Sequence, residues 1–287
     1  MTWGDARLGG DSSSVTGRVA AGVTSITGSR VAFAALKDAG MLKVAATPVP
    51  WRAFAALKEA GEVVTWGAAR RGGDSSAVVD RLGAGVTSIV CTDAAFAALK
   101  DAGEVVIWGL DGLGGDCSGA VADRLSAGVT SITANLGAFA ALKGAGEVVT
   151  WGAAGGGGDS SGVADLLASG VVSVKGTAYA FAALTDAGEV VLVTWGDAGN
   201  GGDSSSVADR LAAGVTSIVC IEAAFAALTE AGEVVTWGPA SSGGDCTVVA
   251  DRLVAGVTSI AVNRGCFAAL KEAGEVLTWG LAWPARW

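Results

Sequence analysis

The chain has 287 residues, of which 51% are hydrophobic and 45 are glycine, a composition that supports a packed core and excludes a largely disordered protein. The net charge of −9 argues against binding to nucleic acid, and the lack of histidine excludes an imidazole base, a Ser–His or Cys–His nucleophile pair and a histidine-ligated metal. No apolar run approaches the roughly 20 residues of a membrane-spanning helix, and no signal-peptide pattern begins the sequence, so we expect a cytoplasmic or nuclear protein without a membrane span.

A repeat of 42 to 44 residues, marked by three short phrases, runs through most of the chain. Trp-Gly recurs at this spacing in a regular series formed by Trp66, Trp108, Trp151, Trp195, Trp237 and Trp279. Phe-Ala-Ala-Leu occurs seven times, whereas Gly-Gly-Asp occurs six times, with its aspartates at Asp11, Asp74, Asp116, Asp159, Asp203 and Asp245. Self-similarity at a fixed period is typical of repeat folds.

The beginning of the chain departs from this spacing. We predict a first unit at residues 1–40 and a truncated second unit at residues 41–61. Residues 44–47 lie ten positions before Phe54, the distance that separates the first and second predicted strands of later units, so we expect 44–47 to form the first strand of the truncated unit. The later units are predicted at 62–103, 104–146, 147–188, 189–232 and 233–274, followed by a closing strand at 275–280 and a tail at 281–287.

One complete unit predicts three successive strands. Residues 86–90 are rich in β-branched side chains, residues 95–99 form a short apolar run, and residues 104–108 form a third apolar segment. Gly103, in the turn between the second and third strands, is expected at positive φ in a short hairpin loop. The Gly-Gly-Asp phrase then interrupts the chain, and its aspartate or the following serine is expected to cap a helical turn near residues 120–125.

A three-stranded meander cannot bury both of its faces alone, so neighbouring units must stack, either in an open solenoid or in a closed ring. The ring is favoured because the chain begins and ends within a unit, so that its two ends can complete one blade and remove the exposed sheet edges. We therefore predict an all-β fold, a β-propeller of three- to four-stranded blades in one domain of residues 1–280. Tryptophan is expected to fill the space between blades.

The stretch GVTSIVCTDAAFAALKDAGEVVIWG, residues 85–109, resembles the repeat of the regulator of chromosome condensation family. The resemblance covers essentially the whole chain, six full units and one partial unit, and implies a propeller of seven blades, one of them truncated here. The short period is similar to that of the propeller-type β-lactamase inhibitory protein. Ala95 replaces the family's usual histidine, and Gly-Gly-Asp-Ser-Ser replaces Gly-Gln-Leu-Gly. In this family, an exchange factor acts through an inserted wedge and a basic segment, and ubiquitin ligases act through a separate catalytic domain. None of these features is recognisable in this sequence, so the resemblance implies a protein-binding role.

Several polar residues repeat in register. The Gly-Gly-Asp carboxylates would suit calcium or a cationic partner, but the same residue types are typical helix caps, so we predict capping, no metal and no cofactor. The arginines of the Asp-Arg-Leu phrase are predicted to make structural ion pairs or carbonyl contacts; they are Arg81, Arg124, Arg210 and Arg252. The five cysteines show no Cys-x-x-Cys spacing and are predicted to be small, buried apolar residues.

Residues that break the repeat are better candidates for binding, because stacking does not require them. Several lie in the predicted loop between the first and second strands of a unit. The candidates for partner binding are Trp51, Arg52, Arg70, Arg71, Asn135, Tyr179, Asn200, Glu222, Asn263 and Arg264.

We therefore predict a non-catalytic scaffold that recognises a protein partner through one rim of a propeller. One alternative is a light- or ligand-responsive sensor based on the ten tryptophans, which requires indoles clustered at an interface rather than one per blade. A second alternative is a fragment of a larger repeat protein, such as a substrate-recruiting module of a ubiquitin ligase.

Overall fold

The computed structural model describes residue 15 and residues 17–18, 23–28, 53–186, 192–212 and 214–280. The chain divides into two compact units. The first comprises residues 1–144 and 149–153, and the second comprises residues 145–148 and 154–287.

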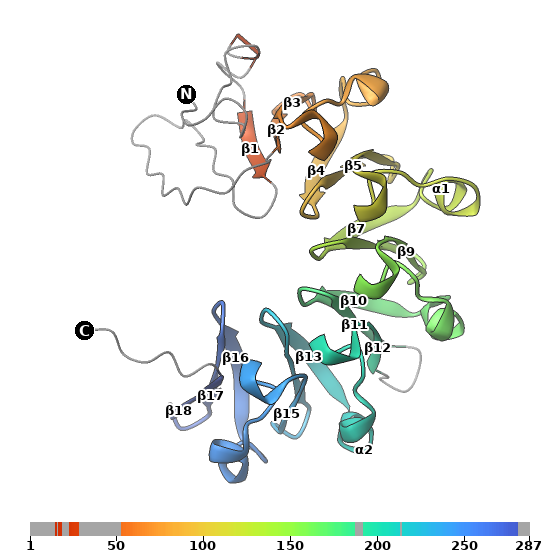
Figure 1. Ribbon diagram of the computed structural model, residues 1–287. Coiled ribbons are helices and arrows are strands. Elements are labelled where there is room, and N and C mark those ends of the chain that lie inside the picture. Colours follow the sequence, from red (N-terminus) through yellow and green to blue (C-terminus); the bar gives the residue numbers. More distant parts are fainter. Residues whose placement is uncertain are drawn as a thin grey trace. The chain divides into compact units, whose positions relative to one another are not determined.

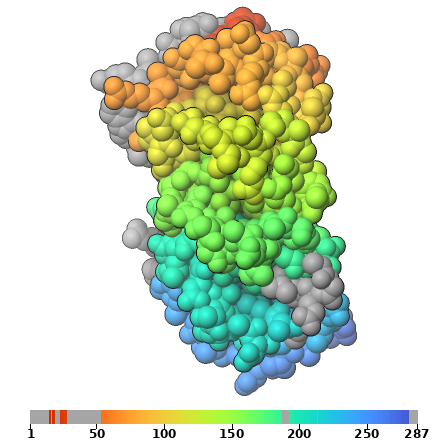
Figure 2. Space-filling model, turned by 90° about the vertical axis from the view of Figure 1, so that its right-hand side faces the viewer, coloured from red at the N-terminus to blue at the C-terminus, as the bar shows by residue number. Residues whose placement is uncertain are grey.

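The first unit contains three antiparallel sheets in chain order, each built from consecutive strands. Their strands are β1 (Val23–Gly28), β2 (Ala53–Lys58) and β3 (Val63–Gly67); β4 (Val86–Cys91), β5 (Ala95–Lys100) and β6 (Val105–Gly109); and β7 (Val129–Ala134), β8 (Ala138–Lys143) and β9 (Val148–Gly152). Figure 1 shows β4 and β5 beside β7 of the following sheet, and Figure 2 shows the same residues following one another from orange to yellow-green on one face.

The second unit repeats this arrangement in three further sheets. Their strands are β10 (Val171–Gly176), β11 (Ala180–Thr185) and β12 (Leu192–Gly196); β13 (Val215–Cys220), β14 (Phe225–Thr229) and β15 (Val234–Trp237); and β16 (Val257–Val262), β17 (Cys266–Lys271) and β18 (Val276–Gly280). The described residues thus hold six three-stranded sheets. The all-β fold class with three-stranded, propeller-type blades is confirmed.

Short helices connect the sheets. Most are 3₁₀ turns, and none of the helices in the described part of the chain is long and apolar enough to cross a membrane. In the first unit they are η3 (Ala69–Arg71), η4 (Ser76–Val78), η5 (Asp111–Leu113) and α1 (Ala120–Arg124). In the second unit they are η6 (Ala154–Gly156), η7 (Ser161–Leu167), η8 (Ala198–Asn200), η9 (Ser205–Val207), α2 (Ala208–Leu211), η10 (Ala240–Ser242) and η11 (Thr247–Arg252).

The hairpin between the second and third strands is as predicted. Gly103 has a φ of 76°, and a Cβ atom added there would lie 2.6 Å from the backbone nitrogen of Gly128. The turn therefore needs glycine both for its left-handed backbone and for the close approach of the next repeat.

The prediction for the first strand of the first described sheet was wrong. Strand β2, which contains Phe54, pairs with β1 on one side and with β3 on the other, so both of its edges are occupied by described strands. The predicted strand at residues 44–47 lies outside the described ranges. Ser25 lies opposite Leu57, as Ser88 lies opposite Leu99 in the next sheet. Strand β1 has the repeat's own Val-Thr-Ser-Ile sequence, and this match outweighs the distance along the chain.

Within each unit, consecutive sheets pack face to face through alternating side chains. Strand β2 directs Ala53, Ala55 and Leu57 into a cluster with Phe96 and Trp108 of the following sheet. Because side chains alternate across a strand, the other face of each sheet is free to receive the sheet before it. The repeated Phe-Ala-Ala-Leu strand therefore contributes side chains to the contact on each face of its sheet.

Closure and a count of seven blades stay predictions. The unit predicted at residues 1–40 and the tail at 281–287 fall largely or wholly outside the described residues. In the last described sheet, Leu270 and Val276 are 41% and 59% exposed, whereas the equivalent Leu99 and Val105 of an internal sheet are buried.

Candidate functional site

The repeated tryptophans support the scaffold. Trp108 is buried, its ring stacks on Phe96 with centroids 5.2 Å apart, and its indole Nε1 donates a hydrogen bond of 2.9 Å to the carbonyl of Gly72 in the preceding Gly-Gly-Asp loop. The same stacking on phenylalanine occurs for Trp66, Trp151, Trp195, Trp237 and Trp279. The described indoles lie one per sheet, which is the distribution expected of a scaffold rather than of a tryptophan-based sensor.

The Gly-Gly-Asp aspartates are occupied by their own loops. The Asp74 carboxylate accepts a hydrogen bond of 2.9 Å from the backbone nitrogen of Ser76, at the start of η4. This bond lowers the pKa of Asp74, because it stabilises the ionised form. Bonds of the same kind lower the pKa of Asp159, Asp203 and Asp245. Asp116 makes no such bond within the described residues, and the predicted cap of the helical turn near residues 120–125 is wrong, because α1 begins after Gly119 with no side-chain cap. Within the described ranges, no three acidic or cysteine side chains are grouped to hold a metal ion.

Three of the four Asp-Arg-Leu arginines, Arg81, Arg210 and Arg252, pair with the glutamates at the hairpin tips of the following sheets. Arg81 Nη2 lies 2.6 Å from Glu104 Oε1 and also donates to the carbonyl of Val105 at 3.2 Å. Arg210 pairs with Glu233, and Arg252 with Glu275, in the same way. Arg252 lowers the pKa of Glu275 by hydrogen bonding to its ionised carboxylate. The hairpin glutamates are therefore partners of the preceding connector rather than simply solvated turn residues.

We expect Arg210→Leu to lower the free energy of unfolding by less than about 1 kcal/mol, because the side chains of this ion pair remain 47% and 23% exposed. The chain itself carries leucine at this place in one repeat, at the exposed Leu166. Urea denaturation at low and high salt measures the effect, and the difference from wild type should shrink as salt increases. A salt-independent loss of several kcal/mol would contradict this interpretation.

Two cysteines at equivalent places lie inside the sheets. Burial raises the pKa of Cys91 to about 12, and burial also raises the pKa of Cys220, whose Sγ donates to the carbonyl of Gly176. Neutral thiols of this kind are packing residues, in agreement with their assignment as small apolar side chains. All five cysteines are half-buried rather than fully buried as predicted.

The residues that break the repeat divide into four groups. Trp51 and Arg52 lie outside the described residues. Asn135 is 8% exposed, and its side-chain oxygen accepts hydrogen bonds from the backbone nitrogens of Gly137 and Ala138, so it shapes its own loop and does not offer a contact surface. Thr92 makes the equivalent bonds in the preceding sheet. Arg70 and Arg71 belong to η3, with Arg70 exposed and Arg71 half-buried.

The remaining candidates come together on one rim of the second unit. The backbone nitrogen of Ala178, beside Tyr179, donates a hydrogen bond of 2.7 Å to the carbonyl of Glu222 in the next sheet's loop. Arg264 Nε, one loop further along, lies 3.9 Å from Glu222 Oε2. The Asn200 carbonyl accepts from Thr177 Oγ1, which brings η8 beside the first of these loops.

We call this set, with Asn263, the loop rim: Tyr179, Asn200, Glu222, Asn263 and Arg264. The phenol of Tyr179 belongs to a residue that is 44% exposed, and the side chain of Arg264 is 84% exposed. Asn263 uses its side-chain oxygen to bind the backbone nitrogens of Gly265 and Cys266, which leaves its amide nitrogen for other contacts. The rim thus combines an exposed aromatic residue with groups of both charges.

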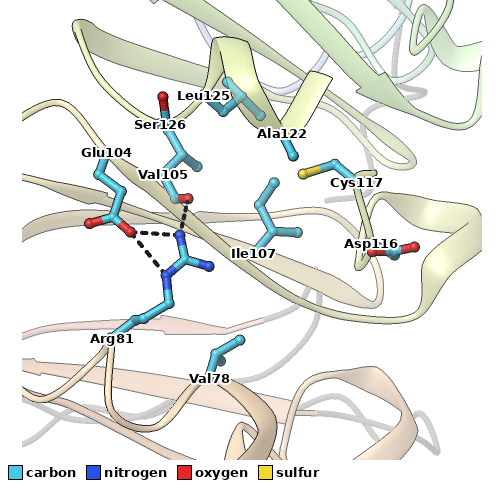
Figure 3. A pocket seen from close by; sticks show the side chains of 10 residues that line it. All are labelled: Val78, Arg81, Glu104, Val105, Ile107, Asp116, Cys117, Ala122, Leu125 and Ser126. Carbon is cyan, nitrogen blue, oxygen red and sulfur yellow. Dashed lines mark hydrogen bonds and ion pairs between the residues drawn. The ribbon is translucent and has the colours of Figure 1, made fainter. Parts of the chain in front are cut away.

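A pocket in the first unit was missed by the sequence analysis. It has a volume of about 260 Å³ and lies between η4, β6 and α1, where Val78, Ile107 and Leu125 form its apolar wall (Figure 3). The available signal was a length difference: nine positions separate Asp116 from Leu125, but eight separate Asp74 from Leu82.

No protein-family model and no curated protein matches this chain. Solved structures similar to it include human WBSCR16, at 17% identity over 79% of this chain and 74% of that chain, with a TM-score of 0.48. They also include Prp20p from Saccharomyces cerevisiae, characterised for its binding properties to Gsp1p and histones, at 16% identity over 79% and 69% of the two chains, with a TM-score of 0.46. Yeast RCC1 (Prp20) bound to Kap60 aligns at 17% identity over 79% and 68%, with a TM-score of 0.46. Likeness at this level of identity concerns the fold alone.

Proposed function

We propose that this protein is a non-catalytic scaffold that recognises a protein partner through the loop rim of its second unit. The observation that carries the proposal is that Tyr179, Glu222 and Arg264, which the repeat does not require, come together on three consecutive loops. Neutral drift of single loop positions gives no reason for an exposed aromatic residue and an exposed arginine to gather at one place.

The residue types suit protein recognition. Tyrosine and arginine are enriched among the side chains that contribute most to protein–protein binding, because each joins a large contact area to hydrogen-bonding groups. The loops rest on sheets whose phenylalanine and tryptophan rings are buried and stacked, so the rim is held by a rigid base. Rigid support reduces the entropy lost on binding.

The partner is expected to meet an acidic protein. The net charge of −9 favours encounter with a basic surface, whereas Arg264 and Glu222 on the rim itself provide one group of each sign for orientation. Recognition through these residues requires neither a metal nor a cofactor.

The test compares proteins captured by the immobilised full chain and by a Tyr179→Ala/Arg264→Ala variant. We expect at least one captured protein whose affinity, measured after its purification, falls about tenfold or more in the rim variant. Val248→Ala is the matched control, because Val248 is 95% exposed on η11 of the same unit and lies outside the rim. The proposal would be contradicted if the rim variant captured every partner as well as the wild-type chain does. It would also be contradicted if the Val248→Ala control lost binding as strongly as the rim variant.

A further inference from the structure

The connector that follows β6 combines three features, of which only the cysteine recurs in another described repeat, as Cys246. Ile107 stands where Thr65 stands in the first sheet, and Cys117 stands where Ser75 stands. Gly119 is part of a connector one residue longer than its counterparts and has a φ of 60° and a ψ of −138°. The short α-helix α1 begins directly after Gly119, which is its N-cap residue.

The changes remove two bonds that fasten the connector elsewhere. In the first repeat, Thr65 Oγ1 and Ser75 Oγ share a hydrogen bond of 2.8 Å, and Thr194 and Ser204 share one of 3.1 Å in the second unit. Isoleucine has no hydroxyl group, so this bond cannot form between Ile107 and Cys117. Elsewhere the Gly-Gly-Asp aspartate accepts a hydrogen bond from the backbone nitrogen two residues later. This bond is also missing at Asp116, so its carboxylate, exposed at the pocket mouth, is not tied to the backbone.

The result is a pocket with an apolar floor and a polar mouth. Ile107 and Leu125 are 9% and 2% exposed and form the floor, together with the half-buried Val78. Burial raises the pKa of the Cys117 thiol, so this wall of the pocket is neutral. At 260 Å³ the pocket is slightly smaller than the roughly 300–1,000 Å³ typical of sites for drug-sized molecules, and its size suits one side chain with its adjoining backbone.

The polar mouth can serve one donor and one acceptor. Arg81 uses Nε and Nη2 for Glu104, and its Nη1 makes no bond within the described residues and points toward Ile107 (Figure 3). Nη1 is therefore a free donor, and the Asp116 carboxylate is a free acceptor. Arg81, Glu104 and Asp116 sum to one negative charge, which disfavours an anionic ligand.

We infer that this pocket binds an aliphatic side chain of an extended peptide, whose backbone carbonyl accepts from Arg81 Nη1 and whose backbone amide donates to Asp116. A neutral peptide unit supplies one acceptor and one donor beside an apolar side chain, and this combination matches the mouth and the floor. The pocket lies in the first unit and the loop rim in the second, so this binding site is additional to the proposed function.

The test uses N-acetyl-leucine methylamide as the probe and the methyl NMR signals of Ile107, Leu125 and Val78 of the full chain as the readout. We expect saturable shifts with a dissociation constant on the order of 1–10 mM, as suits a ligand of this size. N-acetylglycine methylamide, which lacks the side chain, and N-acetyl-leucine, which carries a carboxylate, should each bind about tenfold more weakly. Equal binding of either compound, or no saturable shift with the probe, would overturn the assignment.

Two variants locate the site. A variant with Ile107→Thr, Cys117→Ser and deletion of Gly119 restores the sequence pattern of the other repeats, and Ala122→Leu fills the pocket from α1. Each should weaken the probe at least tenfold, and the second keeps the test valid if the first fails to fold. Cys246→Ser, at the equivalent place in the second unit, and the rim variant Tyr179→Ala/Arg264→Ala should leave probe binding unchanged. Probe binding that survives pocket filling would overturn the inference, and a loss of probe binding in the rim variant would do the same.

Discussion

Phe96→Ala is expected to lower the free energy of unfolding of the first unit by about 4 kcal/mol, the largest effect of any single substitution considered. The ring of Phe96 is fully buried between consecutive sheets, where it stacks on Trp108 at 5.2 Å and packs against Ala53, Ala55 and Leu57. Removing it leaves a cavity that the alanines around it are too small to fill. The stacking contribution of about 1 kcal/mol is lost together with the buried area.

Urea denaturation followed by far-ultraviolet circular dichroism measures this loss without depending on the fluorescence of Trp108. Phe96→Leu is the control, because leucine keeps much of the buried apolar area and gives up only the ring stacking and part of the volume, so its loss should be clearly smaller. If alanine cost no more than leucine, the ring would not be the element that joins the two sheets.

The strands were predictable because the same strand pattern recurs in successive repeats. In the unit at residues 86–109, the predicted strands agree with β4, β5 and β6 to within one or two residues, and Gly103 has the predicted positive φ. Short hydrophobic runs form strands and glycines form turns through residues that are adjacent in the chain, so the local sequence is enough to predict both.

Contacts between repeats were less predictable, because they join residues far apart in the chain. The bond between Trp108 and Gly72 spans 36 positions, and the ion pair between Arg81 and Glu104 spans 23. Because the tryptophans and arginines recur at the same place in each repeat, a structural role could be predicted for them. The repeat did not show which group in a neighbouring repeat each side chain binds. The distance argument for residues 44–47 failed for the same reason, since strand pairing selects matching sequence rather than neighbouring positions.

Asn135 and Gly119 show two limits of reading single residues from the repeat. Asn135 breaks the sequence repeat but not the hydrogen-bonding repeat, because its side-chain oxygen accepts from the same loop nitrogens as the hydroxyl of Thr92. Conversely, Gly119 looks ordinary in a glycine-rich chain, yet the length change around it opens a pocket. A change of residue type was therefore a poor predictor of a functional site. The hydrogen bonds that a side chain can make, and the number of residues between the Gly-Gly-Asp aspartate and the following leucine, were better predictors.

Gly114→Ala is expected to lower the free energy of unfolding by about 3 kcal/mol. Gly114 has a φ of 91°, which costs an L-residue about 1–2 kcal/mol. An added Cβ would also lie 2.7 Å from Cδ2 of Phe139, so that the ring would have to move from its stack on Trp151, at a further cost of about 1–2 kcal/mol. The carbonyl of Gly114 accepts the hydrogen bond of Trp151 Nε1, so one shift disturbs three contacts.

Gly112→Ala is the matched control, two positions earlier in the same turn. Nothing lies within 4 Å of a Cβ placed there, and its φ is outside the left-handed region, so we expect stability to be unchanged or to rise by up to about 1 kcal/mol. Gly114→Asn separates the two causes, because asparagine tolerates the left-handed backbone but brings the same Cβ. If asparagine costs as much as alanine, the approach of Phe139 dominates, and if asparagine is nearly neutral, backbone strain does. Equal stability of the Gly114→Ala and Gly112→Ala variants would show that the loop does not pack against the following sheet as described.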